Sequence, residues 1–188
     1  MARMIPSVIS PDVKSWAERK IFKWFKEAPD TEDWIVLHSL NLPEHETVID
    51  GEADFVVIAP KYGIFVLEVK GGRVKRNDGM WEFINRFGNV DKKSRGPFEQ
   101  AKEAINSIMK HVEKRSDSNH GDMKNIFYGY GVMVPDMDYE TMGVDEEPWM
   151  VFDSKDNDNV KDYIVRVFKG WKRRWEETYG TLYPDKLP

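Results

Sequence analysis

Residues 51–70 read GEADFVVIAPKYGIFVLEVK, two apolar runs separated by a short segment with a proline. The apolar runs predict two strands, over 47–58 and 63–70, because a turn-forming segment lies between them. A three-residue turn at 60–62 gives an antiparallel register in which the numbers of paired residues sum to 122. This register pairs apolar residues with apolar residues along the hairpin, which favours it over its neighbours.

The same register places two carboxylates opposite each other. Asp54 pairs with Glu68, with Cβ atoms roughly 4.5–5.5 Å apart, and such a pair of like charges is destabilising unless something neutralises it. Lys70 lies on the face of Glu68, since alternate residues of a strand share a face. Carboxylates without His or Cys favour a hard divalent cation, Mg²⁺ or Mn²⁺. The alternative is that Glu68 and Lys70 are only polar residues at a strand end.

Two acids, a lysine and a metal on one sheet face form the equipment for activating water against a phosphodiester. The metal would polarise the phosphate and lower the pKa of bound water. The ammonium group of Lys70 would orient that water or offset charge that develops on the phosphate. We therefore expect Asp54, Glu68 and Lys70 to be catalytic, with the two acids as metal ligands.

Glu18 and Gln100 are further candidates, each on a predicted helix. The run Ser10-Pro11-Asp12 predicts the start of a first helix that ends near residue 26. Glu18 falls in its apolar arc, where a carboxylate needs a partner such as a water or the lysine; the alternative is a capping box with Ser15. Gln100 lies beside the apolar stripe of a second helix over 97–112, where it can reach a water or phosphate, although a plain surface Gln fits equally well.

The rest of the chain completes an α/β pattern. Short strands are predicted over 34–37 and 126–134, and a hairpin joins 74–75 to 81–84. A strongly amphipathic last helix starts near Val160 and carries Trp171 and Trp175. We expect an α/β fold with a mixed central sheet flanked by helices.

Composition limits the possible classes of protein. The chain has no Cys, seven Trp and a net charge of −5, and its N-terminus has no apolar segment typical of a signal peptide. No apolar run is long enough to cross a membrane. These features predict a soluble, cytoplasmic protein without membrane contacts.

Positive charge is concentrated directly after the candidate site. Eight basic residues and three acids lie between positions 70 and 95. This local excess indicates a surface that holds a nucleic-acid backbone, although a merely solvated face is the alternative. The nucleic-acid-binding candidates are Arg73, Lys75, Arg76, Lys92, Lys93 and Arg95.

Several other features of the sequence have simpler interpretations than a catalytic or metal-binding site. We expect all four histidines, at 38, 45, 111 and 120, to be surface or loop residues, since they show no metal-ligand spacing. Trp171 and Trp175 indicate a docking stripe rather than platforms for base stacking, whereas the basic run 172–174 can touch phosphate. The acidic segment 153–158 lacks the glycine turn and final Glu of a calcium loop.

The ordered set of motifs resembles the nuclease-related domain (NERD), a branch of the PD-(D/E)xK restriction-endonuclease-like superfamily. The similarity runs from about Ser10 to Val112. Its parts are the helix with Glu18, Gly51-Glu52-Ala53-Asp54 before an apolar strand, Tyr62-Gly63-Ile64-Phe65-Val66-Leu67-Glu68-Val69-Lys70-Gly71, Trp81, and Pro97-Phe98-Glu99-Gln100. The chain departs from many relatives at Glu52 and at Gly96-Pro97, which bears on substrate preference rather than on the central acids.

The resemblance implies specific roles and an architecture. Asp54, Glu68 and the backbone carbonyl of Val69 would bind the metal, Lys70 would be the catalytic lysine, and Glu18 and Gln100 would support the site. A restriction-endonuclease-like core is expected over residues 1–115, and 116–188 would complete the same domain with a strand and the last helix.

We therefore expect a Mg²⁺- or Mn²⁺-dependent nuclease that cuts DNA by structure rather than by sequence, with single-stranded, forked or duplex DNA as substrate. RNA is not excluded as a substrate, and the resemblance implies a fused or associated helicase as a partner. The main alternative is a non-catalytic module that uses the nuclease-like fold to bind nucleic acid or dock a partner. A second alternative is a hydrolase of another phosphoester, which a closed pocket in place of an open groove would indicate.

Overall fold

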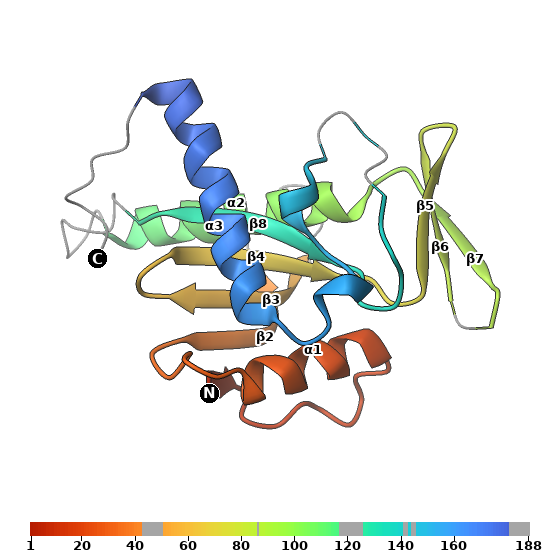
Figure 1. Ribbon diagram of the computed structural model, residues 1–188, viewed down its shortest axis with the longest axis horizontal. Helices are drawn as coiled ribbons and strands as arrows, with labels where there is room; N and C mark the ends of the chain where they lie inside the picture. The colour runs from red at the N-terminus through yellow and green to blue at the C-terminus, as the bar shows by residue number, and fades with distance from the viewer. Residues whose placement is uncertain (43–50, 86, 117–125, 141–142, 144–145, 181–188) are drawn as a thin grey trace.

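The computed structural model describes residues 1–42, 51–85, 87–116, 126–140, 143 and 146–180 (Figure 1). Its strands are β1 (Arg3–Ile5), β2 (Ile35–Leu42), β3 (Gly51–Ala59), β4 (Gly63–Val69), β5 (Arg73–Asn77), β6 (Met80–Ile84), β7 (Val90–Lys93), β8 (Tyr128–Met133) and β9 (Val151–Phe152). Its helices are α1 (Trp16–Glu27), α2 (Pro97–Ser116) and α3 (Val160–Tyr179), with short 3-10 turns η2 (Pro148–Met150) and η3 (Ser154–Asp156).

A mixed sheet of six strands forms the centre of the molecule, in the order β1-β2-β3-β4-β8-β9. Strand β3 lies antiparallel to both of its neighbours, β2 and β4, whereas β8 lies parallel to β4. Helices α1 and α3 share one hydrophobic cluster with the sheet, and α2 packs into a separate cluster with β3 and β4. Figure 1 shows α3 crossing the sheet. The predicted α/β fold with a mixed sheet flanked by helices is confirmed.

The hairpin of β3 and β4 has the predicted register. Val56 pairs with Val66 and Ile58 with Ile64, and the turn is closed by the Tyr62 amide, which donates to the Ala59 carbonyl at 2.8 Å. Residues 47–50, which we expected to begin the first strand, lie outside the described residues.

The alternation of side chains along β3 is interrupted at Asp54. Phe55 belongs to the cluster of α1 and α3, but both Ala53 and Val56 belong to the cluster of α2. Ser39, the residue opposite on β2, has a φ of 55°, in the left-handed region. Strict alternation predicted that Asp54 and Val56 lie on the same face of β3, but the alternation is broken between Ala53 and Phe55.

Helix α1 begins at Trp16, so the predicted start at Ser10 is wrong. Ser15 is the N-cap, and its hydroxyl accepts a hydrogen bond from the Glu18 amide at 3.2 Å. The guanidinium of Arg19 donates to the carbonyls of residues 10, 11 and 13, at 3.1, 2.9 and 2.9 Å. These carbonyls therefore accept from a side chain of α1, and the segment before the helix folds as a turn against it.

The other predicted elements are present with shifted ends, and three strands were missed. The predicted strands at 34–37 and 126–134 correspond to β2 and β8, and the predicted hairpin corresponds to β5 and β6. Strands β1 and β9 have only three and two residues, and every residue of β7 is exposed, so none of them has a periodic apolar pattern. Strand β7 joins β5 and β6 in a second sheet, which projects at the right of Figure 1.

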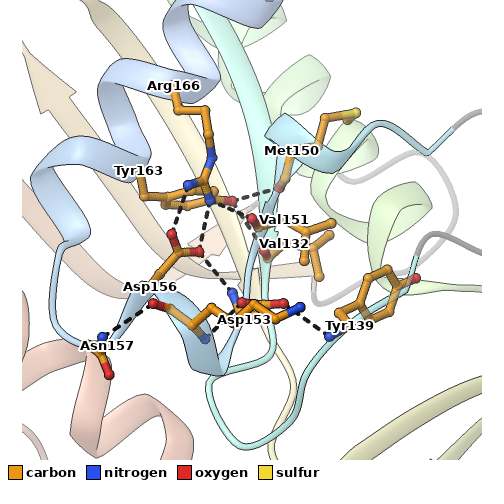
Figure 2. Close-up of polar contacts among 10 residues, drawn as sticks. Val132, Tyr139, Met150, Val151, Asp153, Asp156, Asn157, Tyr163 and Arg166 are labelled. Atoms are coloured by element: carbon orange, nitrogen blue, oxygen red, sulfur yellow. Dashed lines mark hydrogen bonds and ion pairs between the residues drawn. The ribbon is translucent and has the colours of Figure 1, made fainter.

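The acidic segment 153–158 clamps α3 to the end of the sheet (Figure 2). Arg166 on α3 donates to both carboxylate oxygens of Asp156, at 2.7 and 2.8 Å, and to the Val151 carbonyl at 2.7 Å. Asp153 caps η3 by accepting from the Lys155 amide at 2.9 Å. Asp153 and Asp156 are thus engaged in local structure, as a cap of η3 and as the partner of Arg166.

No helix in the described ranges is long and apolar enough to cross a membrane.

Candidate active site

The acids of the central hairpin lie close to the predicted lysine. Glu68 is buried on β4, with 6% of its surface exposed, and Asp54 is half-buried on β3. The Lys70 ammonium lies 2.5 Å from Oε1 of Glu68. The Val69 amide donates to Oδ2 of Asp54 at 2.7 Å, which fixes this carboxylate beside the end of β4. The strands thus bring together two acids and one lysine at one end of the hairpin.

Burial and mutual repulsion make both acids costly to ionise. Burial raises the pKa of Asp54 well above its ordinary value, and the charge of Glu68 raises it further. Burial also raises the pKa of Glu68, although the neighbouring Lys70 charge opposes this shift. A pair of neighbouring carboxylates, one buried and one half-buried, with raised pKa values is typical of a site that binds a cation or moves a proton.

Lys70 keeps its charge in this setting. Burial, the largest single effect, lowers the pKa of its ammonium group. The carboxylates of Glu68 and Asp54 together outweigh that effect, so the pKa of Lys70 is raised. Lys70 is therefore a permanent cation between two acids.

Glu18 faces this group from α1, and its partner is a histidine. Nε2 of His38 donates to Oε2 of Glu18 at 3.2 Å, and the charge of Glu18 contributes to the raised pKa values of Asp54 and Glu68. Both interpretations of Glu18 hold in part. Its amide completes the Ser15 cap, but its carboxylate turns to His38 instead of closing a capping box.

The expectation that His38 is a surface or loop residue is wrong. His38 lies in β2 with 5% of its surface exposed, and its ring lies 4.8 Å from that of Phe55 and 5.7 Å from that of Phe22. The missed signal is that His38 continues the apolar run from Ile35, at a position where the alternation of the strand points it toward α1. His111 is half-buried on α2, and the other two histidines lie outside the described residues.

Gln100 is half-buried in the first turn of α2. Its side-chain oxygen is buried and has no hydrogen-bond partner within the described part of the chain. Such an oxygen is available to a water or an added group. No described contact joins Gln100 to the acids, so its role at the site stays a prediction.

The second sheet contacts the site through one aromatic ring. The Lys70 ammonium lies 5.7 Å from the ring centre of Phe83 on β6, and the Lys93 ammonium of β7 lies 5.9 Å from the same ring. The charge of Arg95 lowers the pKa of Glu68, which places this guanidinium near the acids as well, although it also pairs with Glu103. Lys93 and Arg95 are thus two predicted phosphate-binding residues with a described link to the site.

The remaining predicted basic residues are differently placed. Arg76 lies 3.7 Å from the buried carboxylate of Glu146 and 5.4 Å from the ring centre of Trp81, so it has a structural role. Lys92 pairs with Glu82 at 2.7 Å. Two others are exposed on β5, namely Arg73 and Lys75.

The donor atoms fit a hard cation better than a soft one. Among the described residues, no three His, Cys, Asp or Glu side chains form a group that could hold a metal. The site offers two carboxylates, and the Val69 carbonyl is the backbone group that the family resemblance adds. Mg²⁺ is commonly bound in this way, by one or two carboxylates with water and substrate phosphate completing the shell. The residues present therefore fit a Mg²⁺ or Mn²⁺ ion.

Comparison with known proteins identifies a family. The family model described as nuclease-related domain, NERD, matches residues 14–132, well over half of the chain. The matched range contains α1 with Glu18, the β3–β4 hairpin, the second sheet and α2. No match was found among curated proteins or among solved structures. The chain belongs to the nuclease-related domain family, whose general placement is in the PD-(D/E)xK superfamily.

Proposed function

We propose that the protein is a Mg²⁺- or Mn²⁺-dependent nuclease that hydrolyses phosphodiester bonds in DNA, selecting its substrate by structure rather than by sequence. The observation that carries the proposal is the convergence of Asp54, Glu68 and Lys70. Two neighbouring acids that repel each other, beside a lysine that stays charged, are arranged for a divalent cation and a phosphate. Membership of the nuclease-related domain family supports the same assignment.

Asp54, Glu68 and the Val69 carbonyl would hold the ion. When bound, a divalent cation supplies polarisation of the phosphate and a water of lowered pKa. Lys70, held by Glu68, offsets negative charge that develops on the phosphate during hydrolysis. Glu18, fixed by His38, accepts a hydrogen bond from water at the site and so helps to orient it.

The second sheet would hold the DNA backbone. Lys93 shares the ring of Phe83 with Lys70, the charge of Arg95 acts on Glu68, and Arg73 and Lys75 are exposed on β5 of the same sheet. Contacts of this kind bind phosphate without reading bases, which fits selection by structure. Single-stranded or forked DNA is the proposed substrate, and a helicase, fused or associated, is the proposed partner that supplies it.

The test is cleavage of end-labelled single-stranded, forked and duplex DNA, with Mg²⁺, with Mn²⁺ or with EDTA. Asp54→Asn and Lys70→Met are compared with wild type, and each has a matched control on the surface, Asp33→Asn and Lys61→Met. Loss of one group that stabilises developing charge costs about 10²–10³ in rate. We expect losses of that order for the site variants and none for the controls.

Two outcomes would contradict the proposal. Metal-dependent cutting that survives both site substitutions would mean that another site, or a contaminant, carries the activity. Metal-independent binding of DNA without any cutting by folded wild type would favour the non-catalytic binding module.

A further inference from the structure

A groove separate from the acids lies between α2 and α3. Its volume is about 640 Å³, and none of Asp54, Glu68 and Lys70 lines it. Its floor is the first half of β8, and its walls are the first half of α2 and the last turns of α3. Six aromatic residues line it: Phe98, Tyr128, Tyr130, Trp171, Trp175 and Tyr179.

The aromatic rings of the groove are held in fixed positions. The indole of Trp171 donates to the Tyr130 carbonyl at 2.8 Å and lies directly over Gly129, where a Cβ would come within 2.5 Å of it. Trp175 lies 5.6 Å from Tyr128 and 5.7 Å from Tyr179, measured between ring centres. Because the rings are pre-positioned, a flat ligand can stack on them with little loss of conformational entropy.

The ring series ends at the surface. Tyr179 is 76% exposed, although it is the kind of side chain that folding usually buries at least in part. Since Trp175 is half-buried and contacts Tyr179, the aromatic surface continues from inside the groove to solvent. An aromatic platform of this form is open to a ligand from one side.

Two basic side chains beside the rings are available to bind an anion of a ligand. Lys102 and Arg174 line the groove and are exposed, and neither forms an ion pair with any residue that the structure describes. Arg174 lies over the ring of Trp171, at 5.7 Å from its centre. The next basic residue on the same helix, Arg173, lies instead within 4.0 Å of Glu177. The one acid of the lining, Glu99, caps α2 by accepting from the Gly96 amide at 2.9 Å.

We propose that this groove binds single-stranded nucleic acid, with bases stacked on the aromatic rings and phosphates on Lys102 and Arg174. The proposal replaces the docking role that the sequence indicated for Trp171 and Trp175. Aromatic platforms combined with unpaired cations are the chemistry that holds single strands without reading their sequence. A duplex hides the flat faces of its bases, so it cannot use the rings. The inference rests on the proposed function in that it assigns a binding site to the single-stranded part of the proposed substrate.

The groove also leads toward the candidate active site. Phe98, at its α2 end, lies 6.2 Å from Trp81 on β6, measured between ring centres. The same strand carries Phe83, whose ring contacts Lys70. A strand held in the groove would therefore reach the acids by way of the first turn of α2.

The test is binding of the full chain, in EDTA, to fluorescein-labelled oligo(dT), oligo(U) and a DNA duplex of equal length, measured by fluorescence anisotropy. Tyr179→Ala removes the most exposed ring, and Trp16→Ala, an aromatic residue of α1 that is 65% exposed, is its control. Arg174→Ala removes an unpaired cation, and Arg173→Ala is its control. Stacking of one base on an aromatic ring contributes about 1–3 kcal/mol, or roughly 5- to 150-fold in affinity.

We expect tighter binding of single strands than of duplex, and at least fivefold weaker single-strand binding by Tyr179→Ala and by Arg174→Ala. The two oligonucleotide types distinguish DNA from RNA as the occupant. The inference would be overturned if both groove variants bound single strands as tightly as the wild type does. It would also be overturned if sedimentation showed that a groove substitution separates a dimer into monomers while the affinity for single strands stays the same. The assay contains no metal, so cleavage that fails with groove binding intact counts against the nuclease proposal alone.

Discussion

Replacing Asp54 by Asn should stabilise the metal-free protein while abolishing activity. In the wild type, burial and the charge of Glu68 both oppose ionisation of Asp54 and raise its pKa. An Asn side chain keeps an oxygen that can accept the hydrogen bond from the Val69 amide, now 2.7 Å long. The substitution thus removes an unfavourable charge and retains the contact that fixes the side chain.

The magnitude follows from the charges at the site. Two like charges about 5 Å apart repel by about 3 kcal/mol at an effective dielectric constant of about 20. The attraction of Asp54 to Lys70 offsets much of this repulsion. We therefore expect Asp54→Asn to increase the free energy of unfolding by about 1 kcal/mol, which is a usual size for replacing a functional residue that destabilises the fold. In a chain of this size, that gain raises Tm by about 2–4 °C.

The gain should depend on pH in a defined direction. Because the pKa of Asp54 is higher in the folded protein than its ordinary value of 3.8, the folded state retains a proton that the unfolded state releases. Stability from the protonated group is present below pH 3.8 and is lost as the pH rises through the folded-state pKa. The advantage of Asp54→Asn should therefore be small near pH 4 and larger at neutral pH.

The assay is thermal unfolding followed by circular dichroism, in EDTA, at pH 4 and pH 8. Asp33→Asn, on the surface, changes the net charge by the same amount and should leave Tm unchanged. Addition of Mg²⁺ should reverse the order, because a ligand at 100 times its Kd stabilises the wild type by about 2.7 kcal/mol and Asn is a weaker ligand. A lower Tm for Asp54→Asn in EDTA at pH 8 would refute the reasoning.

Three further substitutions test other parts of the structure. Lys93→Ala should weaken DNA binding and reduce the slope of log affinity against log salt by about 1 in salt titrations, whereas Lys61→Ala, at an exposed lysine in the turn between β3 and β4, should leave it unchanged. Gly96→Ala should lower the free energy of unfolding in urea by about 1–3 kcal/mol, since a Cβ there would overlap the indole of Trp81; an unchanged midpoint would contradict that packing. Arg166→Met should cost about 1–3 kcal/mol in the same urea assay, because it leaves the half-buried carboxylate of Asp156 without its cationic partner, and a neutral result would argue against the clamp in Figure 2.

The central hairpin was predictable because its interactions are local. Only one register matched Val56 with Val66 across a short turn. The observed strand pairing stops at Phe55 and Leu67, so Asp54 is not paired directly with Glu68 as that register implied, although the two carboxylates still interact. Helices α2 and α3 were likewise predictable from their apolar residues at helical spacing, since each helix buries one face. The interruption of alternation at Asp54 was not readable, because it depends on the backbone of a neighbouring strand.

The errors arise where a side chain from a distant segment decides the structure. The start of α1 depends on Arg19, which takes the carbonyls that would otherwise begin a helix at Ser10. The burial of His38 depends on α1 packing over β2. The basic stretch was treated as one surface, yet Arg76 is held by a buried acid, Glu146, from a loop far along the chain.

The central claim is that Asp54 and Glu68 hold a divalent cation that the cleavage of DNA requires. The most direct measurement is single-turnover cleavage of forked DNA by wild type and Glu68→Gln over a Mn²⁺ titration. We predict saturable, Mn²⁺-dependent cutting by the wild type, and a rate at least about 100-fold lower for Glu68→Gln at every Mn²⁺ concentration. Equal rates for the two proteins would contradict the account.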